Sequence, residues 1–429
     1  MSHTAEIIAV GTELLLGNIT NTNASEISRA LSAVGVNVFW HTVVGDNPER
    51  LREALDIARK RADVILTTGG LGPTYDDLTK QTVCETFGKP LVLREDVLEH
   101  IRTYFARNVH LTMPENNRQQ AEFPADCVIF DNPVGTAPGC AFEAEGVHVL
   151  MLPGPPFEMR TMLQNHAIPY LRSLSSEVIV SHDIMTFGLG ESPMEELMRE
   201  KISRMENPSL ATYAKPSEVR LRATAKAADV EAAEAMLAPV VQAVTGYLGD
   251  IVYGVDVPSL EAACMAHLKA QGLTFATAES CTGGQVAARI TALPGASNVY
   301  RGGVVSYWTS VKAEVLGVSQ TLLDQYGAVS EECARSMAEN ARRITGADIG
   351  LSVTGVAGPD ADERGNPVGL VYVGLASQSG TWCRKLDLGN RRRDRIQDLA
   401  ANHAFDMLRR CLTGLPVEQP GTGKPMEKM

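Results

Sequence analysis

In the N-terminal part of the chain, segments with the hydrophobic pattern of strands alternate with segments that have the pattern of helices. Short runs rich in apolar residues are typical of buried strands, and they lie at 6–10, 36–41 and 63–68. Other segments repeat apolar side chains at helical spacing, and they lie at 23–34 and 48–61. Strands that alternate with helices predict a parallel sheet with helices on both of its faces. Because this pattern continues to about residue 174, we expect a first α/β domain over 1–174.

The pattern changes over residues 175–254. Strict alternation of apolar and polar residues at 219–225 is typical of a strand with one face in solvent. The other predicted strands are 177–187 and 247–252, and the predicted helices are 192–205 and 229–244. This order predicts a small α+β middle domain.

Alternation of strands and helices resumes after residue 254. The predicted helices are 260–271 and 285–292, and the predicted strands are 274–278, 303–307, 349–354 and 368–376. We therefore expect a third domain, again α/β, over 255–413. The tail at 414–429 is rich in Pro, Gly and Lys, and we expect it to be disordered.

Composition and charge narrow the class of protein. The 429 residues are 44% apolar and 21% charged, which is typical of a globular protein. A net charge of −12 disfavours binding to nucleic acid, because phosphates attract basic surfaces. No apolar stretch approaches the roughly 20 residues of a membrane helix, and residues 1–6 lack the features of a signal peptide. Eight dispersed cysteines without a CxxC pair predict free thiols, so we expect a cytoplasmic protein.

The segment AESCTGG at 278–284 holds the clearest candidate for chemistry. Ser280 follows a predicted strand and precedes a predicted helix, so its hydroxyl faces the free N–H groups of a helix N-terminus. Such groups can bind a phosphate or the oxyanion of a tetrahedral intermediate. The segment also fits a structural role, in which Ser280 or Thr282 caps the helix.

Three later segments add charged and glycine-rich positions. Lys312 is expected in the first turn of a helix, five residues after Tyr307. A cation is disfavoured there, so Lys312 is either a solvated surface residue or a base with a lowered pKa. The loop TGVAGP at 354–359 lets backbone approach a ligand, although glycines also simply form turns. The arginines of GNRRRDR at 389–395 suit phosphate binding, and they also fit an exposed helix face.

These four segments, in this order, resemble the C-terminal domain of the CinA family, which is similar to bacterial nicotinamide mononucleotide (NMN) deamidase. The resemblance covers about 255–413. It implies an amidohydrolase that deamidates NMN to nicotinate mononucleotide without a cofactor.

The resemblance also assigns roles to residues of this domain. Ser280 is the implied nucleophile, Lys312 its base, and Tyr307 a pocket residue beside them. Arg391 and Arg395 match the arginines that would hold the substrate phosphate. The other implied substrate-binding residues are Thr282, Gly283, Gly284, Thr309, Thr354, Gly355, Ala357 and Gly358.

Two positions depart from the family pattern: Thr309, where Asn is usual, and Asn390, where Asp is usual. The threonine oxygen can accept a backbone N–H, so we expect Thr309 to cap the helix that carries Lys312. The other reading is that the usual Asn contacts substrate, and Thr309 then weakens the binding of NMN.

Loops at the ends of predicted strands also point to a site in the first domain. The segment TTGGLGPTYDD at 67–77 ends a strand in glycines whose amides can form a nest for anions. Asp76 and Asp77 follow, and Asp46 ends another strand; these carboxylates could hold a divalent metal that bridges phosphate oxygens. The structural reading is that Asp76 and Asp77 start a helix.

These loops resemble the molybdopterin-binding, MoaB/MogA-like domain as it occurs in CinA proteins, over about 1–172. Members of that class bind molybdopterin, whereas the CinA branch is associated with ADP-ribose pyrophosphatase activity. The segments GTELLLG at 11–17 and PGPP at 153–156 look like the CinA branch and favour hydrolysis. The implied ligand-binding residues are Gly11, Thr12, Glu13, Gly69, Gly70, Gly72, Pro73, Thr74, Pro153, Gly154 and Pro155.

The middle domain resembles the KH-type module of CinA proteins. A KH domain that binds nucleic acid clamps the backbone with a GxxG loop, and no GxxG lies between the predicted helices at 192–205 and 229–244. We therefore expect a connector or a dimer contact.

Two functions from different classes remain open. The first is a bifunctional hydrolase of NMN and ADP-ribose, with a divalent metal ion in the first domain and a homodimeric assembly. The second is a protein that binds a pterin or nucleotide without turnover and is linked to competence or DNA damage.

Overall fold

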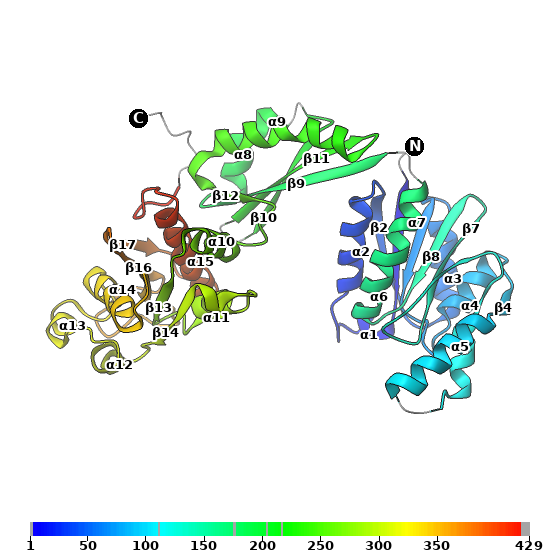
Figure 1. Cartoon of the computed structure of the whole chain (residues 1–429), viewed down its shortest axis with the longest axis horizontal. Coiled ribbons are helices and arrows are strands. Elements are labelled where there is room, and N and C mark those ends of the chain that lie inside the picture. Colours follow the sequence, from blue (N-terminus) through cyan, green and yellow to red (C-terminus); the bar gives the residue numbers. More distant parts are fainter. Residues whose placement is uncertain (1–2, 110–111, 175–176, 203–204, 216–217, 422–429) are drawn as a thin grey trace. The chain divides into compact units, whose positions relative to one another are not determined.

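A computed structural model describes residues 3–109, 112–174, 177–202, 205–215 and 218–421. The chain forms two compact units, Met1–Val180 with Ala225–Ala235, and Ser181–Thr224 with Met236–Met429. Both units combine helices with sheets (Figure 1), and the predicted α/β fold with a small α+β middle domain is confirmed. Within the described ranges, no helix is both long and apolar enough to cross a membrane.

A six-stranded sheet, in the order β2-β1-β3-β8-β7-β6, organises the first unit. Its strands are β1 (Thr4–Val10), β2 (Asn37–Val44), β3 (Val64–Thr68), β6 (Val128–Phe130), β7 (Gly139–Ala144) and β8 (Val147–Leu152). Strands β2, β1, β3 and β8 are parallel, whereas β7 and β6 are antiparallel to their neighbours. The prediction of an all-parallel sheet is wrong at this edge, because Glu145 and Gly146, with φ of 55° and 78°, form a tight hairpin.

Helices cover both faces of this sheet (Figure 1). One face packs against α2 (Thr22–Ser32), α6 (Pro156–Met162) and α7 (Ile168–Leu174). The other packs against α3 (Pro48–Ala58), α4 (Thr79–Thr86) and α5 (Glu95–Tyr104). The remaining elements are α1 (Thr12–Leu15), β4 (Leu91–Leu93) and β5 (Glu122–Pro124), with short 3-10 or π turns at Phe105–Val109, Glu115–Ala121 and Leu163–Ala167.

The middle domain is a four-stranded sheet in the order β10-β11-β9-β12 with two helices. Its elements are β9 (Val178–Phe187), α8 (Glu191–Ile202), β10 (Ser209–Lys215), β11 (Glu218–Ala227), α9 (Val230–Leu248) and β12 (Val252–Val255). Sequence analysis did not predict β10, and it ended the second helix too early. That helix continues because Val244 and Leu248 are both buried at helical spacing, so the last strand begins later, after a 3-10 turn at Gly249–Ile251.

A five-stranded sheet, β14-β13-β15-β16-β17, forms the C-terminal domain. Its strands are β13 (Phe275–Glu279), β14 (Tyr300–Val305), β15 (Ile349–Gly355), β16 (Leu370–Ser377) and β17 (Gly380–Asp387). The first three are parallel, and β16 and β17 are antiparallel. Sequence analysis did not predict β17, which is joined to β16 by a two-residue loop.

Helices again lie on both faces of the sheet. One layer contains α10 (Leu260–Gln271), α11 (Gln285–Thr291) and α15 (Arg393–Leu412), and the other contains α13 (Gln320–Tyr326) and α14 (Glu331–Thr345). A 3-10 turn at Ala296–Asn298 precedes β14, and the short helix α12 (Thr309–Glu314) follows this strand. Helix α14 begins where Ser330 accepts a hydrogen bond from the Cys333 amide, and acidic residues follow in its first turn.

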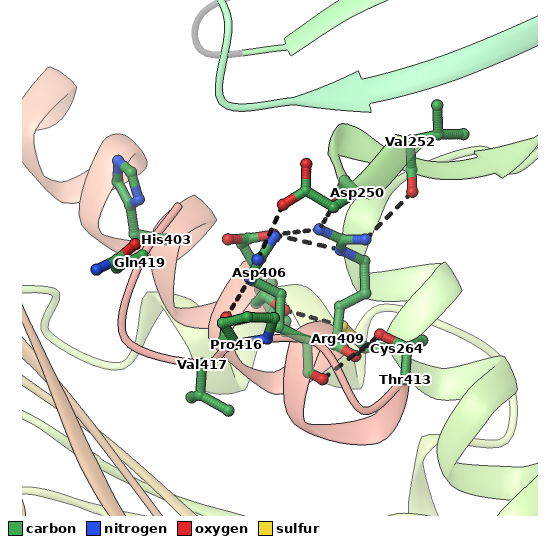
Figure 2. A network of polar contacts seen from close by, with 12 residues as sticks. Asp250, Val252, Cys264, His403, Asp406, Arg409, Thr413, Pro416, Val417 and Gln419 are labelled. Atoms are coloured by element: carbon green, nitrogen blue, oxygen red, sulfur yellow. Dashed lines mark hydrogen bonds and ion pairs between the residues drawn. The ribbon is translucent and has the colours of Figure 1, made fainter. Parts of the chain in front are cut away.

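A buried network of charges joins the middle domain to the C-terminal domain within the second unit (Figure 2). Asp406 of α15 is fully buried and accepts hydrogen bonds from Arg384 at 2.9 Å and Arg409 at 2.7 Å. Arg409 also donates to the main-chain oxygens of Asp250 and Val252. Since each buried charge has a partner, removing one would leave another unpaired, which is costly.

The same network holds part of the C-terminal tail. Arg384 donates to the carbonyl oxygens of Val417 and Gln419, and Val417 is buried. The chain therefore makes defined contacts as far as Gln419, although disorder was predicted from residue 414. Residues 422–429, the rest of that predicted segment, lie outside the described residues.

Candidate functional site

The strand-to-turn junction after β13 places Ser280 against Lys312 of α12. The side-chain nitrogen of Lys312 lies 2.7 Å from the Ser280 hydroxyl oxygen and 2.5 Å from the main-chain oxygen of Ser306. The structure thus brings together two residues that are 32 positions apart, as the predicted catalytic pair requires. The Ser280 hydroxyl is hydrogen-bonded to Lys312 and does not cap helix α11.

Lys312 is an unusual lysine because only 1% of its surface is exposed. Burial lowers the pKa of its amine below the ordinary lysine value, and the thiols of Cys333 and Cys281 act weakly in the opposite direction. No carboxylate forms an ion pair with Lys312 among the described residues. A neutral amine can donate one proton to the Ser306 oxygen and point its lone pair at Ser280, which suits a general base.

Glu279, which sequence analysis did not select, organises the turn that carries Ser280. Its buried carboxylate accepts hydrogen bonds from the Thr282 hydroxyl and from the amides of Gly284, Val286 and Ala287, over 2.8 to 3.1 Å. The expectation that the N–H groups of helix α11 are free for a ligand is therefore wrong for these three amides. An acidic residue just before a predicted helix was the available signal.

The amides of Cys281 and Thr282 remain available in the same turn. Neither donates to an oxygen of the residues that the structure describes. An amide next to a nucleophile is suited to stabilising the oxyanion of a tetrahedral intermediate.

A cavity of about 570 Å³ opens beside the Ser280–Lys312 pair. The thirteen residues predicted for this site fall in two groups. Those that line the cavity are Ser280, Tyr307, Thr309, Lys312, Thr354, Gly355, Ala357 and Gly358, whereas Thr282 serves the Glu279 turn. Gly283, Gly284, Arg391 and Arg395 are likewise absent from the lining.

Arg393 is the arginine of the GNRRRDR segment that reaches the cavity. It donates to the main-chain oxygen of Gly358 at 2.7 Å and to the Tyr307 hydroxyl. Arg391, in contrast, is exposed and donates to the Leu388 oxygen. Four arginines within five positions could not be told apart from sequence, because the first turn of α15 decides which one faces the loop.

Thr309 is exposed at the first position of α12 and lines the cavity. The N-cap position of α12 is Trp308, and no side chain makes a capping hydrogen bond there. The expectation that Thr309 caps this helix is therefore wrong, and its side chain borders the space in which a ligand would lie.

The first unit holds a second cavity of about 570 Å³, at the ends of its parallel strands. Almost all residues predicted for this site line it: Gly11, Glu13, Gly69, Gly70, Gly72, Pro73, Thr74, Pro153, Gly154, Pro155, Asp46, Asp76 and Asp77. Thr12 is absent from the lining; its amide donates to the Asp46 carboxylate, and its hydroxyl accepts from the Asp46 amide.

The glycine-rich loop after β3 forms one wall of this cavity. Gly69 has a φ of 105°, and a Cβ atom there would lie 2.1 Å from the Val10 oxygen, so only glycine fits. Within the described chain, the amides of Gly70, Leu71 and Gly72 donate to no recorded partner. The predicted nest for an anion is therefore sterically possible at this loop.

The donor set of this cavity fits a hard divalent cation that arrives with a phosphorylated ligand. Five carboxylates line it, those of Glu13, Asp46, Asp76, Asp77 and Glu158, and the lining contains no Lys, Arg or His. No three acidic, His or Cys side chains among the described residues are close enough to enclose a metal by themselves. Mg²⁺ commonly needs only one or two carboxylates, with phosphate oxygens and water as its other ligands.

The carboxylates of this cavity differ in how strongly they are engaged. Asp77 accepts hydrogen bonds from the Thr74 amide, at 2.9 Å, and from the Thr74 hydroxyl. The Asp76 side chain is exposed, and no described residue donates a hydrogen bond to its carboxylate. Glu158, which sequence analysis did not select, is buried.

Three models of known families match the chain. They are described as "Probable molybdopterin binding domain" over 6–173, "Damage-inducible protein CinA KH domain" over 181–254 and "CinA C-terminal domain" over 257–412. The matches follow the order of the N-terminal, middle and C-terminal domains.

Two relatives match this chain over most of its length. A putative competence-damage inducible protein of Acetivibrio thermocellus is 48% identical over 411 residues, which are 96% of this chain and 99% of the relative. A CinA-like protein of Kosmotoga olearia is 46% identical over 412 residues, with the same coverage. The crystal structure of CinA from Thermoplasma acidophilum is 35% identical and covers 38% of this chain and 95% of its own, with a TM-score of 0.35.

Each of the two relatives covers 96% of this chain, and the matched region therefore includes all three domains. This chain is a member of the CinA family of competence-damage inducible proteins.

Proposed function

We propose that the C-terminal domain hydrolyses the carboxamide of NMN to release ammonia and nicotinate mononucleotide. The observation that carries the proposal is the buried Lys312 amine 2.7 Å from the Ser280 hydroxyl, at the wall of a cavity that can hold a nucleotide. A buried lysine that forms no ion pair with a carboxylate is suited to remaining neutral and acting as a base.

In the proposed reaction, Lys312 takes the Ser280 proton as the serine oxygen bonds to the carboxamide carbon. The amides of Cys281 and Thr282 are placed to donate to the resulting oxyanion. Lys312 then gives the proton to the leaving nitrogen, and the C–N bond breaks to release ammonia. Water, deprotonated by Lys312, cleaves the acyl-serine ester and restores the free hydroxyl.

The direct test is ammonia release from NMN by the full chain and by Ser280→Ala. We expect a loss of at least about 10³-fold, since the variant removes the hydroxyl that lies against the Lys312 amine. Ser319→Ala is a matched control, because Ser319 is exposed and makes no side-chain capping bond. Activity within threefold of wild type in Ser280→Ala would eliminate the mechanism, and no ammonia from wild type would favour a non-catalytic binding protein.

A second activity, metal-dependent hydrolysis of ADP-ribose, is proposed for the first unit. It is supported by a nucleotide-sized cavity that combines unpaired amides with five carboxylates and no cationic side chain. Asp76 and Asp77 would hold the metal, with Asp46 nearby, and the bound metal would neutralise the diphosphate.

The N-terminal proposal is tested by formation of AMP from ADP-ribose with added Mg²⁺ or Mn²⁺. Asp76→Asn should reduce AMP formation and leave ammonia release from NMN unchanged. If wild type with added metals never forms AMP, binding of a pterin or nucleotide without turnover takes its place. Assembly as a homodimer, a cytoplasmic location and weak affinity for nucleic acid stay predictions.

A further inference from the structure

Glu158 differs from the other four carboxylates of the N-terminal cavity. Only 9% of its surface is exposed, whereas Glu13 and Asp76 are exposed and Asp46 and Asp77 are intermediate. It lies in the first turn of α6, behind the PGPP loop. Burying a carboxylate costs free energy, because the charged group loses its contacts with water. A buried carboxylate in a cavity wall is therefore a candidate functional residue.

One oxygen of Glu158 is fixed and the other is left open. The amide nitrogen of Asn132 donates to Oε2 at 2.5 Å, and the same nitrogen donates to the Ala137 oxygen at 3.0 Å. The Asn132 oxygen in turn accepts from the Val134 amide. Asn132 is therefore held in one orientation, and no described residue donates to Oε1 of Glu158.

The main chain closes tightly around the fixed oxygen. A Cβ atom at Gly135 would lie 2.3 Å from Oε2, so any larger residue there would displace the Glu158 carboxylate from this position. On the same helix, Arg160 is paired with Glu26 and leaves Glu158 without a cation. Burial raises the pKa of the Glu158 carboxyl, and the hydrogen bond from Asn132 opposes this.

We propose that Glu158 is the general base of the N-terminal site, with Asn132 as the residue that positions it. The inference rests on the proposed hydrolysis of a nucleotide diphosphate ester by this unit. It assigns the proton transfer to Glu158 and leaves Asp46, Asp76 and Asp77 for the metal.

In this step, Oε1 of Glu158 takes a proton from a water molecule as the water oxygen bonds to one phosphorus of the diphosphate. The bond from that phosphorus to the bridging oxygen breaks, and the bridging oxygen leaves with the second phosphate and the bonding electron pair. The products are two phosphate monoesters, and Glu158 returns its proton to solvent.

The test compares AMP formation from ADP-ribose and Mg²⁺ by the full chain, by Glu158→Gln and by Glu26→Gln. Glutamine keeps the shape of Glu158 and loses its basicity, so kcat should fall by about 10²- to 10⁴-fold while binding of ADP-ribose persists in titration calorimetry. Glu26→Gln removes a carboxylate that also contacts α6, through Arg160, but lies outside the cavity; it should stay within threefold of wild type. In wild type, kcat/KM should fall as the pH drops through the raised pKa of Glu158.

Each other result overturns the inference in a distinguishable way. An active wild type with an equally active Glu158→Gln removes Glu158 alone and leaves the hydrolase. Equal losses of binding and turnover in Glu158→Gln would show a structural role. A wild type that forms no AMP with Mg²⁺ or Mn²⁺ removes the N-terminal activity together with the inference, while ammonia release from NMN reports whether the preparation is otherwise functional.

Discussion

The two cavities of this protein have the same volume, about 570 Å³, but differ in the side chains that they offer for catalysis. The C-terminal cavity contains a nucleophile and a buried amine, and its lining combines three cationic side chains, those of Lys312, Arg364 and Arg393, with the carboxylates of Asp324, Asp360, Asp362 and Glu363. The N-terminal cavity is lined by five carboxylates and by no Lys, Arg or His. The first can therefore attack a substrate with its own side chains, whereas the second needs an added positive charge to accept a phosphate.

This difference also explains where each site places its buried ionisable group. In the C-terminal site burial disfavours the charged form of Lys312, so the amine is available as a base. In the N-terminal site burial raises the pKa of Glu158, so its carboxylate is a stronger base than an exposed one. Burial thus favours the neutral form of both groups: it lowers the pKa of the Lys312 amine and raises the pKa of the Glu158 carboxyl.

Removal of divalent metal should separate the two sites most sharply. With a chelator present, AMP formation should fall below detection, because nothing else in the N-terminal cavity neutralises the diphosphate. Ammonia release from the same sample should not change. Sensitivity of both activities would contradict the contrast between the cavities, and restoration by added Mg²⁺ is the control against loss of protein.

Replacement of the buried lysine should give the next largest effect. Lys312→Met keeps a long apolar stem and removes the base, so kcat/KM for NMN should fall by about 10³-fold. Lys312→Arg should fail similarly, since guanidinium stays protonated. AMP formation should remain at the wild-type level in both variants.

The pH profile of wild type sharpens the same prediction. Deamidation needs neutral Lys312, so kcat/KM should rise with pH through the Lys312 pKa, which burial holds below the ordinary lysine value. A rate that falls as the pH rises through neutrality would instead require a protonated group and would exclude Lys312 as the base.

Arginine replacements test which part of the C-terminal cavity meets the substrate phosphate. Arg393→Ala should raise KM for NMN by about 13- to 160-fold, as expected for loss of a charged hydrogen bond of roughly 1.5–3 kcal/mol. Arg391→Ala is the matched control, because Arg391 is exposed and absent from the lining. A larger effect at Arg391 would return the phosphate to the residue that the family resemblance implied.

The order of elements could be predicted from sequence because hydrophobic spacing records burial locally. Helices such as α3 and α10 begin where predicted, and β13, β15 and β9 fall close to their expected positions. Strand direction was harder, because it depends on short turns such as that at Glu145 and Gly146. The strands β10 and β17 were missed, since their apolar residues alternate with polar ones over only a few positions.

Prediction of the site residues was limited in the same way, because contacts between distant residues cannot be read from the sequence. Ser280 and Lys312 could be paired through their motifs, but Glu279 and Glu158 were missed because their roles depend on contacts. Glu279 caps a helix with its side chain, and Glu158 meets Asn132, which is 26 positions away. Sequence spacing alone does not show which acidic residue will be buried.

The smallest expected effect concerns Thr309, at the mouth of the C-terminal cavity. The side chain lines the cavity and does not cap α12, so the Asn that is usual in the family would also face the ligand. Asparagine reaches further than threonine and offers two donors and an acceptor. One added hydrogen bond of about 0.5–1.5 kcal/mol corresponds to roughly 2- to 13-fold in affinity. Thr309→Asn should therefore lower KM for NMN by this factor at nearly constant kcat, with Thr309→Val as the control that removes the hydroxyl at equal size. An unchanged KM in Thr309→Asn would place the substrate away from this edge, on the side of Arg393.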